Sequence, residues 1–93
     1  MELENFYKGD EDWRNRVTVD SKLWTNSVSQ IELLEKLDNH LDIAIVVNGK
    51  LGDSSLSWID GEIPALENLK PVDCLQSESF MKRLKVCLSR MHQ

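Results

Sequence analysis

The chain has few of the residues that build disulfide scaffolds, metal sites or irregular loops. Of its 93 residues only two are cysteines, two are prolines and four are glycines. Two cysteines are too few for a disulfide-rich secreted scaffold. Cys74 and Cys87 lie thirteen residues apart with no pair of histidines nearby, so a zinc site lacks ligands. We expect both cysteines to be small buried apolar residues, and we expect no metal or cofactor.

Long apolar runs and a basic leader are also missing. The longest apolar run, residues 43–47 (IAIVV), has a quarter of the roughly 20 apolar residues that span a bilayer. Residues 1–5 (MELEN) are acidic, whereas a secretory signal begins with a basic region followed by an apolar one. These features predict a cytoplasmic protein with no membrane-spanning segment.

The excess of cations that nucleic-acid binding requires is absent. The chain has 11 Lys+Arg against 16 Asp+Glu, a formal net charge of −5. Because cationic contacts to phosphate supply most of that affinity, this balance argues against nucleic acid as the main partner. One local exception is a group of four cations near the C-terminus: Lys82, Arg83, Lys85 and Arg90. Either they complement the negative end of a C-terminal helix, or they form a contact patch for an acidic partner.

No catalytic constellation stands out. A nucleophile needs a base within hydrogen-bond reach, but Cys87 and His92 lie five residues apart and therefore on different faces of one predicted helix. The acidic run 10–12 is typical of a solvated face. Residues 49–52 (GKLG) are too short for a phosphate-binding loop. We predict no enzyme activity and expect His40 to be a surface or half-buried side chain.

The clearest periodic pattern predicts one helix from Ser29 to Val47. Ser29 and Glu32 have the spacing of a capping box. Apolar residues at steps of three and four form one expected face: Ile31, Leu34, Leu37, Leu41, Ala44 and Ile45. Beyond Ile43 the pattern is apolar on all sides, so we expect that end to be buried on more than one face. Asn48-Gly49 is expected to end the helix.

The first 27 residues have the weakest pattern. We treat 1–27 as an N-terminal arm or short helix that precedes a helical domain over 28–93. The alternation in residues 17–19 (VTV) hints at an extended piece but is too short to decide. Trp13 and Trp24 are expected to cover the core or to contact a second copy, with an exposed patch for a partner as the alternative.

The last third of the chain predicts further short helices. Asp53 is a plausible N-cap, and Pro71 suits the first turn of a short helix. Ser77 is expected to cap a last helix with one apolar stripe: Phe80, Leu84, Cys87, Leu88 and Met91. Together these segments predict an all-α bundle of four to five helices joined by short loops.

The order of features over residues 58–91 resembles the toxin-binding domain of bacterial antitoxins of the Xre/MbcA/ParS type. The chain has Trp58-Ile59, a loop, Pro64-Ala65-Leu66, then residues 71–75 (PVDCL) and an amphipathic helix that ends in residues 88–91 (LSRM). In that family a Trp-Leu pair ends one helix and a loop leads to a small-Leu-Gly-Gly stretch. A proline then begins a short helix, and the final helix closes on Leu-x-Arg-Ile. The predicted helix before Asn48-Gly49 extends the likeness to about residue 28.

The chain also departs from this family pattern. Glu67-Asn68 stands where the family tends to have Gly-Gly, which puts the loop geometry in doubt, and Ile59 replaces leucine. The helix-turn-helix half that usually precedes this domain is not recognisable in residues 1–27, which are too few and have the wrong charge. Little chain follows the last predicted helix. The resemblance therefore implies the toxin-binding half alone.

The resemblance implies a non-enzymatic, antitoxin-like protein that neutralises a RES-type toxin, an NAD-targeting enzyme, by masking its active site. The implied partner surface combines the last helix and the preceding loop: Lys82, Arg83, Lys85, Arg90, Glu62 and Ile63. The implied core anchors are Trp58, Leu66, Pro71, Leu75, Phe80, Leu84 and Leu88.

Two other functions stay open at this point. One is a stand-alone helical adaptor or regulator, encoded by a phage or mobile element, with a different protein partner, because likeness of fold does not carry function with it. The other is a small DNA-binding protein. Separately, a short chain with three tryptophans and an apolar run at 43–47 is expected to form a homodimer, since two copies bury what one cannot.

Overall fold

The computed structural model describes residue 7 and residues 9–90, and it folds them almost entirely into helices. The five α-helices are α1 (Asp10–Asp20), α2 (Val28–Lys36), α3 (Leu41–Leu51), α4 (Ser55–Ile59) and α5 (Glu78–Ser89). Short 3₁₀ turns are η2 (Ser21–Leu23), η3 (Gly52–Ser54), η4 (Pro64–Leu66) and η5 (Pro71–Gln76). In this part of the chain the strand-like pairing is limited to one isolated bridge, Ile63 with Leu69. The all-α prediction is confirmed.

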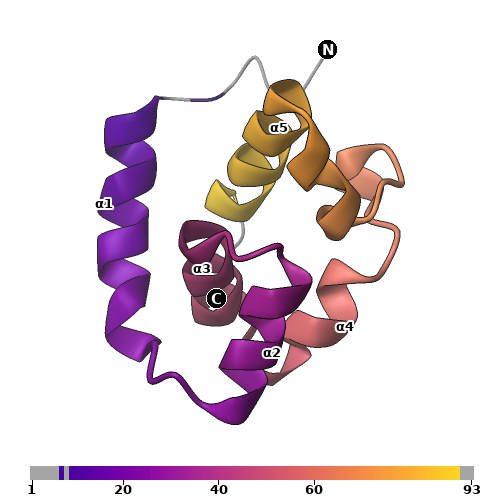
Figure 1. Cartoon of the computed structure of the whole chain (residues 1–93). Coiled ribbons are helices and arrows are strands. Elements are labelled where there is room, and N and C mark those ends of the chain that lie inside the picture. The colour runs from indigo at the N-terminus through magenta and orange to yellow at the C-terminus, as the bar shows by residue number, and fades with distance from the viewer. Residues whose placement is uncertain (1–6, 8, 91–93) are drawn as a thin grey trace.

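Helix α3 is the centre of the fold. Its run 43–47 is buried residue by residue, and α3 contacts α1, α2, α4 and α5. Figure 1 shows α3 between α1 on one side and α4 on the other. A helix that is apolar on all sides has to be surrounded to leave water. The expectation that this end would be buried on more than one face is confirmed.

The prediction of a single helix from Ser29 to Val47 is wrong, because the chain breaks between α2 and α3. Asp38 and Asn39 both have left-handed backbone, with φ of 55° and 62°. The N–H of Asn39 donates to the carbonyl of Leu34 at 2.9 Å, and that of Asp38 to the carbonyl of Glu35 at 3.1 Å. These two bonds form a Schellman motif, which ends a helix. Aspartate and asparagine tolerate the left-handed conformation, so the pair can stop a helix without glycine.

The break changes which residues of α2 enter the core. Leu33 is 1% exposed and Leu37 is fully buried, whereas Ile31 and Leu41 are 37% and 47% exposed. The expected apolar face was therefore wrong for Ile31 and Leu41. Because α2 and α3 are separate helices, each has a buried face of its own. A single apolar pattern that runs through both helices does not match the buried face of either.

The capping residues of α2 are shifted by two positions from those expected. Ser27, rather than Ser29, is the N-cap. The N–H of Gln30 donates to Ser27 Oγ at 3.3 Å, and the N–H of Ser27 donates to Gln30 Oε1 at 3.2 Å. This is a capping box with glutamine in place of the expected Glu32. Farther along, Ser54 rather than Asp53 is the N-cap of α4.

Gly49 does not end α3, contrary to the prediction. The helix continues to Leu51, and Gly52 follows it with φ of 52°. Gly49 is buried against α1 instead: a Cβ added there would lie 2.6 Å from Cγ of Asp20. The missing side chain lets the backbone of α3 approach α1 closely.

Residues 58–90 follow their predicted order. Ile59 ends α4, Pro71 begins η5, and Ser77 caps α5 by accepting a hydrogen bond from the N–H of Phe80 at 3.3 Å. The buried stripe of α5 is confirmed for Leu84, Cys87 and Leu88, and Met91 lies outside the described residues.

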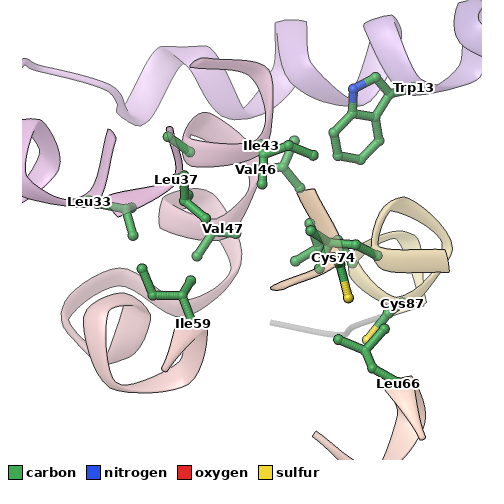
Figure 2. Packing of buried hydrophobic residues seen from close by; sticks show 13 residues of the cluster. Trp13, Leu33, Leu37, Ile43, Val46, Val47, Ile59, Leu66, Cys74 and Cys87 are labelled. Carbon is green, nitrogen blue, oxygen red and sulfur yellow. The ribbon is translucent and has the colours of Figure 1, made fainter. Parts of the chain in front are cut away.

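The predicted core anchors divide into two groups by burial. Leu66, Pro71, Leu84 and Leu88 are fully buried. Trp58, Leu75 and Phe80 are half-buried and pack against the edge of the core. Figure 2 shows Leu66 beside Cys87 in that core. Residue Leu66 thus fills the core from the loop, as expected.

The N-terminal part of the described chain belongs to the same core. Residues 10–20 form α1, which packs on α3 and α5, so the hint of an extended piece at 17–19 is wrong. Trp13 is 4% exposed and points from α1 toward Ile43 and Val46 (Figure 2). Its indole N–H donates to Asp42 Oδ2 at 2.9 Å. None of the helices described is long and apolar enough to cross a membrane.

Candidate protein-binding surface

The cations predicted to bind a partner lie on two sides of α5. Lys85 Nζ lies 5.3 Å from the ring centroid of Trp13 and 5.6 Å from that of Tyr7. Lys82 Nζ lies 6.0 Å from the same Tyr7 ring. Both lysines therefore lie on the side of α5 that faces Tyr7, and Lys85 also faces Trp13 on α1. Arg83 turns the other way, toward the loop that holds η4.

Arg83 is not an exposed partner contact, and this part of the prediction is wrong. Its side chain is 5% exposed, and its Nη1 pairs with Glu67 Oε2 at 3.1 Å. The guanidinium carbon also lies 5.2 Å from the ring centroid of Phe80. A long cationic side chain can bury its stem and still reach a partner. Arg83 therefore joins α5 to the loop, while Glu67, with a side chain 67% exposed, keeps the pair near water.

The loop between α4 and η5 is held by its own backbone. The N–H of Ile63 donates to the carbonyl of Leu69 at 3.1 Å, and the N–H of Asn68 to the carbonyl of Ile63 at 3.0 Å. Glu67 and Asn68 have left-handed backbone, with φ of 58° and 65°. Glu62 is exposed and Ile63 half-buried. In Figure 1 this loop and α1 lie on opposite sides of α5, so the loop lies away from Trp13 on α1, beside which Lys85 is placed.

A pocket of about 230 Å³ opens between α1 and α5. Trp13 and Val86, 4% and 5% exposed, supply apolar walls. Arg16 and Arg90 bring guanidinium groups from the two helices, and Asp12 brings one carboxylate. Arg90 was predicted as a partner contact and lies here.

A second hollow shares two of its lining residues, Asp12 and Arg16, with this pocket. The second hollow, of about 300 Å³, lies between α1 and α3 and is lined by Asp20 and Lys50 on its far side. Sequence reasoning missed Arg16 because residues 1–27 gave no clear periodicity. The available signal was its spacing of three from Trp13, which places the two side chains near each other on a helix.

Tyr7 and Asp10 form a hydrogen-bonded pair beside the pocket. The hydroxyl of Tyr7 donates to Asp10 Oδ1 at 2.7 Å. Burial and then this bond raise the pKa of Tyr7 to about 12. The same bond, with help from the charge of Lys85, holds the pKa of the Asp10 carboxyl below its usual value. At neutral pH the phenol is therefore neutral and the carboxylate charged.

The chain's two thiols lie in the core, as expected. Cys74 is fully buried and Cys87 is 7% exposed. Burial raises the pKa of Cys74 to about 11 and also raises the pKa of Cys87. Both thiols therefore stay protonated at neutral pH, and a thiol is a far weaker nucleophile than a thiolate. No group of three or more His, Cys, Asp or Glu side chains that could hold a metal ion occurs within residues 7 and 9–90.

Comparison with known proteins leaves the family question open. No family model, curated protein or solved structure matches the chain. The resemblance of residues 58–91 to antitoxin domains therefore rests on the order of residues in that segment. Its further support has to come from the geometry of those residues.

Proposed function

We propose that the chain is a non-enzymatic, antitoxin-like binding module that neutralises a RES-type, NAD-targeting toxin by masking the toxin's active site. Masking needs a stable surface of the right shape and charge, and it needs no reactive group. The observation that carries the proposal is the backbone of the loop at Glu67 and Asn68.

Glu67 and Asn68 adopt the conformation that glycine adopts most readily. They occupy the two positions where the antitoxin family tends to have Gly-Gly, and both have positive φ. For residues other than glycine this conformation costs roughly 1–2 kcal/mol each, and somewhat less for asparagine. Glu67 and Asn68 would therefore not both adopt left-handed backbone from local preference alone, and the surrounding fold has to stabilise it. The departure from Gly-Gly no longer argues against the family loop, because the backbone is of the type that Gly-Gly favours.

Contacts around the loop support a preorganised binding surface. The pair of Arg83 with Glu67 ties the loop to α5, and Leu66 fixes the loop to the core. A surface ordered before binding loses less conformational entropy when the partner docks. Glu62 remains exposed on this loop and is free to contact a partner without disturbing the core.

Co-expression with a RES-type toxin encoded beside this gene tests the proposal. The toxin alone should arrest growth, and the chain should restore growth and co-elute with the toxin. Glu62→Lys should weaken rescue, and Lys82→Glu with Lys85→Glu should test the other side of α5. The matched control for Glu62→Lys is Glu32→Lys, and the matched control for the double lysine variant is Arg14→Glu with Lys22→Glu, all at exposed positions.

Absence of both complex and rescue would contradict the proposal. Capture of a different protein, by a chain encoded away from any toxin, would instead favour the adaptor function.

A further inference from the structure

We propose that the pocket between α1 and α5 binds a carboxylate, namely the side chain of an aspartate or glutamate on the partner protein. The identity of the partner as a protein rests on the proposed function. The affinity of the pocket for a carboxylate rests on its own geometry and is testable separately.

The size and walls of the pocket fit a short acidic side chain. Its volume is about 230 Å³, several times the roughly 30 Å³ that one water molecule occupies in the liquid. Trp13 and Val86 line it and are nearly buried, so they offer apolar contact to the methylene groups of a glutamate. Ligand sites commonly combine such apolar walls with a few placed polar groups.

The charge of the pocket is opposite to that of the chain. Two arginines, Arg16 and Arg90, and one aspartate, Asp12, line it, whereas the whole chain has a formal net charge of −5. Lys85 does not line the pocket, but its Nζ lies 5.3 Å from the ring centroid of Trp13, which does. The apolar walls of Trp13 and Val86 favour a carboxylate on a hydrocarbon chain over inorganic phosphate, which offers these walls no apolar contact.

Arg16 has a donor that such a ligand would satisfy. Its Nε is buried and has no hydrogen-bond acceptor among the described residues. A buried donor without an acceptor is unfavourable. The guanidinium group presents Nε–H and Nη–H in a planar fork that matches the two oxygens of a carboxylate. Because Nε is buried, a carboxylate in the pocket would supply the missing acceptor once the Arg16 side chain turns to bring Nε–H toward it.

Titration with 3-phenylpropionate tests the pocket without any partner. We expect this carboxylate to shift the NMR signal of the Trp13 indole, and we expect its amide and inorganic phosphate to leave that signal in place at the same concentration. Arg16→Gln should weaken binding of the probe by roughly tenfold or more, because hydrogen bonds to charged groups are the stronger ones. The matched control is Arg14→Gln, which removes the same charge from an exposed position of α1 and should change affinity less than about twofold.

Two results would overturn the affinity for carboxylates. One is no response of Trp13 to 3-phenylpropionate, and the other is equal affinity in wild type and Arg16→Gln. Arg16→Lys tests whether weaker binding of the probe reflects loss of folding, because lysine keeps the positive charge but lacks the planar guanidinium group. We expect its affinity to lie between those of wild type and Arg16→Gln.

The partner complex tests the origin of the carboxylate. Arg16→Gln should weaken the complex of the chain with the toxin, and Arg14→Gln should not. If both variants bind as tightly as wild type, the partner carboxylate is refuted while the proposed function stands. If no toxin binds wild type, the proposed function fails, and the 3-phenylpropionate titration still decides whether the pocket binds carboxylates.

Discussion

At the scale of single residues, the pair of Tyr7 and Asp10 responds to pH at both ends of the range. The pKa of Tyr7 is raised from 10.0 to about 12, so its contribution to stability is complete below pH 10 and is lost as pH rises toward 12. The pKa of Asp10 is lowered, so its contribution is present above the usual aspartate pKa and is lost as pH falls through the lowered value. Between these two pH limits, the contribution of the pair to stability does not change with pH.

Titration of Tyr7 by ultraviolet absorbance checks the first of these shifts directly, because the chain has a single tyrosine. We expect a pKa near 12 in the folded protein and an ordinary value in denaturant. Asp10→Asn should lower the pKa of Tyr7, since it removes a charged hydrogen-bond acceptor, while burial keeps it above the ordinary value. An ordinary pKa in the folded wild type would show that Tyr7 does not pack beside α1 and α5 as described.

Asn68 allows a residue-scale test of the loop backbone. Its side chain is exposed and its φ is 65°, so a substitution there acts mainly through the backbone. Asn68→Val should lower the free energy of unfolding by about 1–2 kcal/mol, because a β-branched residue adopts left-handed backbone poorly. The control Asn68→Gly should be nearly neutral. Urea denaturation measures both, and equal stability of the two variants would contradict the left-handed conformation.

At the scale of helices, the approach of α1 to α3 depends on Gly49. A Cβ at this position would lie 2.6 Å from Cγ and 2.8 Å from Cβ of Asp20, so the Asp20 side chain or the helices themselves would have to shift. Gly49→Ala should therefore destabilise the protein by about 1–3 kcal/mol, although alanine is normally the better helix former. Gly61→Ala is the matched control, because its Cβ would meet its nearest atom at 3.5 Å. Similar stability of both variants in thermal unfolding would refute the close contact.

The helices also show how far the sequence could be interpreted without the structure. The central position of α3 was predictable, because a helix that is apolar on all sides has to be covered by other elements. The break at Asp38 and Asn39 was not, because both residues also suit the polar face of a continuous helix. The choice between these states depends on tertiary packing, which local propensity does not contain.

The candidate site was less predictable than the fold. Lys85 and Arg90 were identified from their charge alone, but charge does not say which way a helical side chain turns. Arg83 was therefore predicted to be exposed, whereas its side chain turns toward Glu67 and is nearly buried. Arg16 and Arg90 lie at opposite ends of the sequence, and only the packing of α1 on α5 brings them to one pocket.

At the scale of the whole molecule, the expected homodimer stays a prediction, but its basis has changed. The run 43–47 is buried within one chain and is not available to a second copy. The exposed large apolar side chains are instead Val19, Leu23, Val28, Ile31 and Leu41. Light scattering should give twice the mass of one chain, and Val28→Asp, at a side chain 88% exposed, should shift the mass toward that of one chain. The mass of one chain at high concentration would contradict the dimer.

At the scale of the whole molecule, the described helices share one core, to which α1 contributes Trp13. Its radius of gyration of 12.1 Å is close to the roughly 12 Å expected for a compact chain of this length. The loop at Glu67-Asn68 and the pocket at Arg16 lie on opposite sides of α5.

The most direct test of the proposed masking is the NAD consumption of the purified toxin as the chain is added. We predict that the rate falls in proportion to the added chain and reaches its minimum at an equimolar ratio, because one bound module covers one active site. The control Glu32→Lys should inhibit like wild type. An unchanged rate of NAD consumption in the presence of excess folded chain would contradict the proposed function.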